Sequence, residues 1–354
     1  MIFIAFFSLI VLVVIHEFAH FFSAKKFGMK VEEFGIGYPP RVYGKKIKDT
    51  LYSLNLIPFG AFVRFPDEIK AAKEDKFSQQ SVGKRIIVTL AGVVSFWVTA
   101  AILFSIVLAI GARVAVDDNA TGLINPQVQI LGVSSNSPAE KAGIQPGDTI
   151  MEMAIGETIK EITRVIDVQD FTNAHLGEEM EISLQRGKET IDVVVVPRVS
   201  PPKDDGAIGL SLSLTAIERY PWYQSPWKGI VATFDLTKTI ILGYSSAISS
   251  VFSGAPSGIE AMGPVGIVRL VSQMGKLGIA YLLQFIGMIS VYMAIFNALP
   301  IPVTDGGKAV FLIIEKIRKK ALKPELEQKI DAFFFAALIL LMVLVTIKDI
   351  RKFF

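Results

Sequence analysis

The chain has 354 residues, of which 51% are hydrophobic and 19% are charged, and its mean hydropathy is +0.49. This composition is too apolar for an ordinary soluble protein and predicts a membrane protein. The absence of cysteine excludes disulfides, thiolate metal ligands and a cysteine nucleophile, and a net charge of +3 is too small to indicate a nucleic-acid partner.

The first predicted transmembrane helix covers residues 1–24 and contains the motif HEFAH, from His16 to His20. Its apolar run of about 20 residues is long enough to cross a bilayer. No basic region precedes this run and no small-residue cleavage site follows it. We therefore expect a retained helix and not a signal peptide.

The spacing of this motif predicts a zinc site. His16 and His20 are four residues apart, so both imidazoles lie on one helix face and can bind one zinc ion. Glu17 lies about a third of a turn away, where its carboxylate can accept a hydrogen bond from a zinc-bound water. The alternative is a pair of ordinary buried histidines, but that alternative leaves three costly polar groups at membrane depth without a partner.

Charge predicts the topology. Residues 25–85 hold 13 Lys and Arg against 7 Asp and Glu, and residues 301–330 hold 7 against 4. Residues 112–277 hold 13 against 19. Because positive loops stay in the cytoplasm, we expect the first two segments inside, the third outside, and both termini outside. The HEFAH histidines then lie in the cytoplasmic half of a bacterial inner membrane.

Three further spans are predicted, at residues 86–111, 278–300 and 331–348. Residues 201–277 are expected to form a linker followed by an amphipathic helix at 230–252. That helix carries Asp235 and Lys238 in an otherwise apolar segment. We expect it to lie at the membrane interface, and a true span is the alternative.

Residues 112–200 alternate short β-type runs with one helical stretch. Ser137 is a good N-cap, Pro138 suits the first helical turn and Gly143 suits the helix end. The pattern around them, SPAEKAGIQPGDTI, resembles that of a PDZ domain. The resemblance implies an extracytoplasmic domain that either binds a peptide as an added strand or covers the membrane site as a steric gate.

A catalytic zinc needs a third protein ligand, and Asp305 is the best candidate. It follows the third span in the motif NALPIPVTDGG, at the depth expected for the HEFAH histidines. His175 is a poor candidate because it lies in the segment expected on the opposite side of the membrane. The alternative is a simple helix-ending turn with Asp305 in water.

HEFAH and NALPIPVTDGG together resemble the paired signatures of site-2 proteases, the intramembrane zinc metalloproteases, and in particular the bacterial branch that includes the regulator of sigma-E protease. The resemblance covers nearly the whole chain, although Thr304 and Ala61 depart from the usual residues. It implies zinc-dependent cleavage of transmembrane protein substrates, such as an anti-sigma factor trimmed first by another protease, or signal-peptide remnants. It also implies that Asn297 contacts the substrate.

The cytoplasmic β-rich loop, residues 25–85, offers a substrate-binding strand. A helical substrate must be unwound before cleavage, and an edge strand could pair with it. Two stretches, 51–56 and 61–64, have the alternating residue pattern of a strand. The first contains Tyr52 and Leu54, and the second contains Phe62. The alternative is an ordinary hairpin.

The predicted fold is a multi-span α-helical membrane protein of about four transmembrane helices, with a cytoplasmic β-rich loop and one extracytoplasmic α+β PDZ domain. The expected partners are transmembrane substrates and membrane lipid. Two rival functions are an inactive membrane-anchored PDZ scaffold or quality-control adaptor, and a zinc transporter. The transporter is disfavoured because the second and fourth spans are almost purely apolar.

Overall fold

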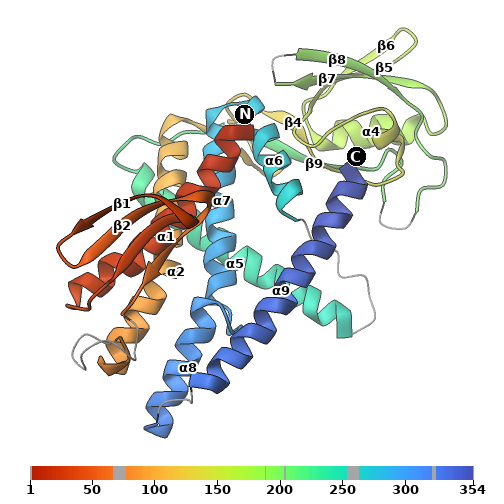
Figure 1. Cartoon of the computed structure of the whole chain (residues 1–354). Coiled ribbons are helices and arrows are strands. Elements are labelled where there is room, and N and C mark those ends of the chain that lie inside the picture. The colour runs from red at the N-terminus through yellow and green to blue at the C-terminus, as the bar shows by residue number, and fades with distance from the viewer. Residues whose placement is uncertain are drawn as a thin grey trace. The chain divides into compact units, whose positions relative to one another are not determined.

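The computed structural model describes residues 2–66, 77–187, 189–202, 205–252, 263–320 and 324–353 (Figure 1). The chain divides into two compact units. The helical unit comprises Met1–Ser105, Pro226–Ser272 and Phe285–Phe354. The sheet unit comprises Ile106–Ser225 and Gln273–Gln284.

Four helices in the described part of the chain are long and apolar enough to cross a membrane. They are α1 (Ile2–Lys26), α2 (Val82–Ile110), α7 (Ile279–Ala298) and α9 (Pro324–Phe353). Their number and order agree with the four predicted spans. Apolar runs of 20 or more residues form helices in lipid because a helix satisfies its own backbone hydrogen bonds.

The helix α5 (Ser225–Phe252) is not one of these four candidates. It runs antiparallel to α2, with Trp97 Nε1 donating to Thr237 Oγ1 at 3.2 Å. Contact is close at Gly229, where an added Cβ would lie 2.6 Å from the carbonyl oxygen of Ala101. The helix therefore packs along a candidate span, and its predicted placement at the interface stays a prediction.

The β-rich loop is confirmed as two long antiparallel strands, β1 (Glu33–Ile47) and β2 (Thr50–Arg64). Both strands fold back, so residues 33–36 pair with 51–54 on one side and with 61–64 on the other. Residues 43–47 pair with 50–54. The resulting order leaves 61–64 at one edge. A short 3-10 turn, η2 (Phe77–Gln79), precedes α2.

The segment after the third span is a helix, α8 (Asp305–Arg318), where the sequence suggested a loop. Thr304 caps this helix: its hydroxyl accepts the Gly307 N–H at 3.3 Å and donates to the carbonyl oxygen of Leu299 at 2.8 Å. A Cβ at Gly307 would lie 2.0 Å from the Ile301 carbonyl oxygen. A Cβ at Gly306 would likewise lie 2.3 Å from the Ala298 carbonyl oxygen. Glycine at both positions therefore allows the backbone of the preceding turn to pack closely against the start of α8.

The helix α6 (Pro264–Leu277) is tied to the far end of α9. The buried carboxylate of Asp349 accepts hydrogen bonds from the N–H groups of Gly263, at 2.9 Å, and Gly266, at 2.8 Å. These N–H groups lie at the start of α6 and have no partner within their own helix. Asp349 therefore acts as an N-cap supplied by another element.

The sheet unit contains one antiparallel sheet in the order β3-β9-β4-β5-β7-β8, with β6 paired to β5 (Figure 1). Its elements are β3 (Ala112–Ala115), β4 (Gln127–Val133), α3 (Pro138–Lys141), β5 (Thr149–Ile155), β6 (Thr158–Glu161), α4 (Val165–Ala174), β7 (Met180–Arg186), β8 (Glu189–Val195) and β9 (Leu210–Glu218). The sheet continues past residue 200, where the domain was expected to end, because β9 lies between β3 and β4 and completes the sheet.

The local predictions in this unit are confirmed. The Ser137 hydroxyl caps α3 by accepting the Glu140 N–H at 3.1 Å, and Pro138 occupies the first turn. Gly143 follows α3 with φ of +75°. Arg186, at the end of β7, donates two hydrogen bonds of 2.7 Å each to buried Asp148, which directly precedes β5. These bonds raise the pKa of the guanidinium.

Candidate metal centre

The structure brings His16, His20 and Asp305 together in the helical unit. The Nε2 atoms of the two histidines lie 3.2 Å apart. Asp305 Oδ2 lies 3.4 Å from Nε2 of His16 and 3.3 Å from Nε2 of His20. Within the described residues, these three form the only group of histidine and carboxylate side chains arranged to hold a metal ion.

The spacing of these donor atoms fits zinc. Zinc bonds of about 2.0–2.1 Å in tetrahedral geometry separate two donor atoms by about 3.3 Å. Nδ1 of His20 lies 2.8 Å from the Val88 carbonyl oxygen, which can only accept a hydrogen bond. Neutral His20 therefore presents a lone pair at Nε2. That lone pair and the buried Asp305 Oδ2, which has no hydrogen-bond partner among the described residues, are donor atoms suited to a metal ion between them.

Three residues of α2, spaced four apart, position the two histidines. The Val88 carbonyl oxygen accepts a hydrogen bond from Nδ1 of His20, which fixes the tautomer of this imidazole. The Phe96 ring stacks on His16 with centroids 4.6 Å apart. Between them, a Cβ at Gly92 would lie 2.3 Å from His20 Nε2 and 2.4 Å from His16 Cε1. A glycine at this position therefore leaves the space that the imidazoles occupy.

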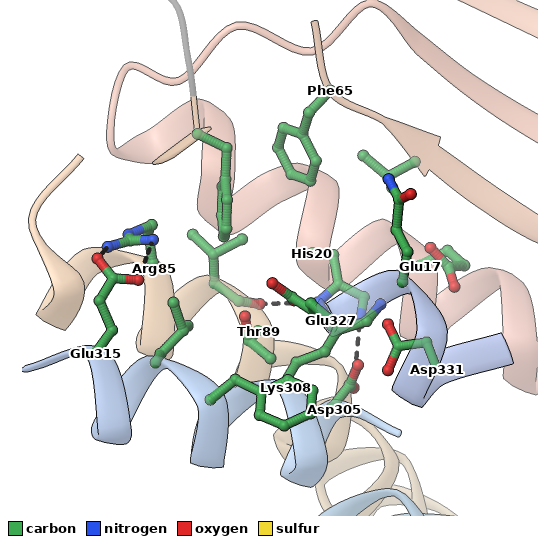
Figure 2. Close-up of a pocket in the computed structure, with 16 residues that line it drawn as sticks. Glu17, His20, Phe65, Arg85, Thr89, Asp305, Lys308, Glu315, Glu327 and Asp331 are labelled. Atoms are coloured by element: carbon green, nitrogen blue, oxygen red, sulfur yellow. Dashed lines mark hydrogen bonds and ion pairs between the residues drawn. The ribbon is translucent and has the colours of Figure 1, made fainter. Parts of the chain in front are cut away.

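A cavity of about 520 Å³ opens beside the three donors. Its wall includes Glu17, His20 and Asp305, together with Lys308 from the first turn of α8 (Figure 2). Glu17 thus lies in the same cavity as His20 and Asp305.

An ion pair on the wall of the cavity links α2 to α8. Arg85 donates two hydrogen bonds to Glu315, one of them 3.1 Å long between Nη1 and Oε2 (Figure 2). Arg85 is buried and Glu315 half-buried. Because breaking a buried pair leaves an uncompensated charge, this pair fixes the helix that carries Asp305.

The edge strand 61–64 lies next to Glu17. Within the described residues it pairs only with 33–36. Val63 lines the same cavity as Glu17. Buried Glu33 fastens this strand to β1 through an ion pair with Arg64, whose Nη1 lies 3.0 Å from Glu33 Oε2.

The predicted substrate-binding residues have different surroundings. Tyr52 and Leu54 lie in a strand that is paired on both sides, so they cannot provide a free edge. Phe62 lies on the edge strand 61–64, but its ring stacks on that of Tyr38, with the two ring centroids 6.1 Å apart. Asn297 donates to the Met293 carbonyl oxygen of its own helix at 2.9 Å. Only the strand that contains Phe62 therefore retains the expected edge.

His175, which the sequence excluded as a ligand, lies in the sheet unit with Nδ1 2.9 Å from the Phe171 carbonyl oxygen. Val88, Gly92 and Phe96 were missed by the sequence analysis. Their contribution is a carbonyl, a lack of side chain and an apolar ring, which look like ordinary features of a membrane helix. The spacing of four between them was the only available signal.

Comparison with known proteins agrees with this geometry. Residues 4–342 match Peptidase family M50. A relative from Clostridium acetobutylicum with a zinc-metalloprotease name is 31% identical over 96% of this chain and 94% of its own length. Zinc metalloprotease RasP of Oceanobacillus iheyensis is 27% identical over 97% of each chain. Regulator of sigma-W protease RasP of Bacillus subtilis is 26% identical over 97% of this chain and 96% of its own.

Proposed function

Because the chain belongs to peptidase family M50, the site-2 zinc metalloproteases, we propose that it holds its zinc with His16, His20 and Asp305 and cleaves transmembrane segments of membrane-anchored proteins. The observation that carries this proposal is the convergence of the three donor atoms, 3.2–3.4 Å apart, where a candidate span meets the start of α8. No other described group offers such a set of ligands.

The chemistry divides between the metal and the side chains. Bound zinc supplies the Lewis acid that polarises the scissile carbonyl and acidifies a water. Glu17 takes the proton from that water and passes it to the amine of the leaving chain. The position of Glu17 on the cavity wall, next to His20, supports this role.

The free edge of β2 holds the substrate in an extended form. A transmembrane helix hides its peptide bonds in its own hydrogen bonds, so it must be unwound before hydrolysis. The segment 61–64 can pair with the unwound chain through its backbone. Since Val63 of this edge lines the same cavity as Glu17, a chain paired there runs past the base.

We propose that the substrates include a membrane-bound anti-sigma factor trimmed first by another protease, or signal-peptide remnants. The name of the Bacillus subtilis relative, a regulator of sigma-W protease, supports the first class. We further propose that the protein resides in a bacterial inner membrane with β1, β2 and α8 on the cytoplasmic side and both termini outside.

The sheet unit is proposed to be an extracytoplasmic PDZ domain, now extended through β9. The capped turn at Ser137 and the antiparallel sheet support this assignment. Its role is either capture of a peptide strand or steric exclusion of large substrates.

Cleavage of a reporter transmembrane helix tests the proposed function. The natural chain and Glu17→Gln are compared in the same membranes, with Glu161→Gln, an exposed residue of β6, as the matched control. We expect cleavage by the natural chain and the control and none by Glu17→Gln. Equal cleavage by all three would reject Glu17 as the base. Absence of cleavage by all three would favour the inactive scaffold.

A further inference from the structure

One positive side chain lies beside Asp305 on the wall of the cavity. Lys308 lies three residues after Asp305 on α8, so the two share a helix face. Lys308 is exposed to the cavity that Glu17, His20 and Asp305 line (Figure 2). The other cation on the cavity wall, Arg85, is already engaged by Glu315.

The ion pairs found among the described residues do not include Lys308. The remaining charged groups on the wall, Glu327 and Asp331 of α9, are anions. An anionic ligand that enters this cavity therefore meets one ammonium group outside these ion pairs, that of Lys308, on a wall that otherwise carries carboxylates.

Peptide hydrolysis creates such an anion. Water adds to the peptide carbon, the C–N bond breaks, and the two new ends are a carboxylate and an amine. A carboxylate in a partly desolvated site is costly unless a charged donor binds it. A lysine one helical turn from the metal ligand can supply that donor.

We propose that Lys308 is the carboxylate-binding residue of this site, and this inference rests on the proposed peptidase function. Its ammonium binds the carboxylate of a chain that occupies the cavity. The carboxylate is the new C-terminus formed by cleavage, or an acidic side chain next to the scissile bond. Lys308 thereby helps to hold the chain in register with the edge strand.

Peptide binding to an inactive chain tests this proposal. Zinc-loaded full-length protein carrying Glu17→Gln is titrated with three fluorescent peptides of one apolar sequence, taken from the N-terminal product of the reporter helix. The first ends in a free carboxylate and the second in an amide. The third is amidated but has aspartate as its last residue. Fluorescence anisotropy gives each Kd.

We expect the free-carboxylate peptide to bind more tightly than the amide, and Lys308→Met to reduce this preference about tenfold. Lys308→Arg should keep the preference because it keeps the charge. Lys316→Met, an exposed lysine of the same helix outside the cavity, should leave the preference unchanged. Tighter binding of the aspartate peptide than the plain amide would assign the carboxylate to a substrate side chain as well.

An unchanged preference in Lys308→Met would overturn the proposal. A loss of zinc in Lys308→Met would also overturn it, because the residue would then support the metal site itself. The binding measurement uses an inactive chain and does not depend on catalysis. A failure of reporter cleavage would therefore count against the proposed peptidase function, whereas a failure of carboxylate binding would count against the role of Lys308 alone.

Discussion

Nδ1 of His20 donates a hydrogen bond to the carbonyl oxygen of Val88, with 2.8 Å between the two atoms. This bond joins the face of α1 that carries His16 and His20 to the backbone of α2. It leaves Nε2 of His20 with a lone pair available to the proposed zinc. The helix α2 therefore orients a proposed ligand although it contributes none.

The tight contact at Gly92 gives the first prediction. A Cβ at this position would overlap both imidazoles, at 2.3–2.6 Å from their atoms. We expect Gly92→Ala to lower zinc content and cleavage at least tenfold, because the rings must move out of the geometry that holds zinc. Gly83→Ala, where an added Cβ meets nothing within 4 Å, is the control. Full zinc content in Gly92→Ala would contradict the role of α2.

A second prediction concerns the edge strand. Val63 lies on the edge segment 61–64 and lines the cavity beside Glu17. Proline at this position removes a backbone N–H that an added strand could use. We expect Val63→Pro to bind zinc normally but to cleave the reporter helix at least tenfold more slowly. Cleavage at the natural rate would show that the substrate does not pair with this strand.

The N-cap supplied by Asp349 gives a third prediction. Asp349→Ala leaves the N–H groups of Gly263 and Gly266 without their acceptor and should destabilise the start of α6 by about 1 kcal/mol. Faster hydrogen exchange of the α6 amides in the full chain measures this loss. Unchanged exchange in α6 would mean that the contact contributes nothing to its stability.

A fourth prediction uses the pH dependence of Asp167 in the capping box of α4. Partial burial raises the pKa of this carboxyl, but hydrogen bonds from Thr163 and the Arg164 N–H outweigh burial and hold it below its ordinary value. A depressed pKa stabilises the folded state above the unfolded pKa of about 3.9, and the contribution disappears as the pH falls through the folded pKa.

Asp167→Asn should therefore weaken the protection of α4 amides by about 1 kcal/mol at pH 7, and the difference from the natural chain should be smaller at about pH 3, because it is lost as the pH falls from the unfolded pKa through the folded pKa. Asp170→Asn, an exposed residue of α4, is the control at both pH values. A difference of the same size at both pH values would show that the charge of Asp167 is not responsible.

Much of this architecture could be predicted because it depends on local patterns. The four spans follow from long apolar runs, and the pairing of His16 with His20 follows from helix geometry. Asp305 could be placed because its depth was set by the span before it. The helix α8 was missed because Gly306 and Gly307 are poor helix formers, and only the packed turn around them explains their presence.

Two other features could not be predicted from local sequence. The strand β9 joins the sheet through partners far away in the chain, β3 and β4, and it follows a segment that reads as a linker. Val88 contributes a backbone carbonyl, a group that every residue carries. Such contacts depend on how two helices pack, and no side-chain pattern records them.

The zinc content of purified full-length protein tests the central claim most directly. We predict about one zinc per chain for the natural protein and for Asp331→Ala, a carboxylate on the cavity wall outside the group of three proposed ligands. We predict a large loss of zinc for Asp305→Ala, because Asp305 Oδ2 lies 3.3–3.4 Å from both histidine donors. Unchanged zinc content in Asp305→Ala would contradict the assignment of the third ligand and, with it, this account of the site.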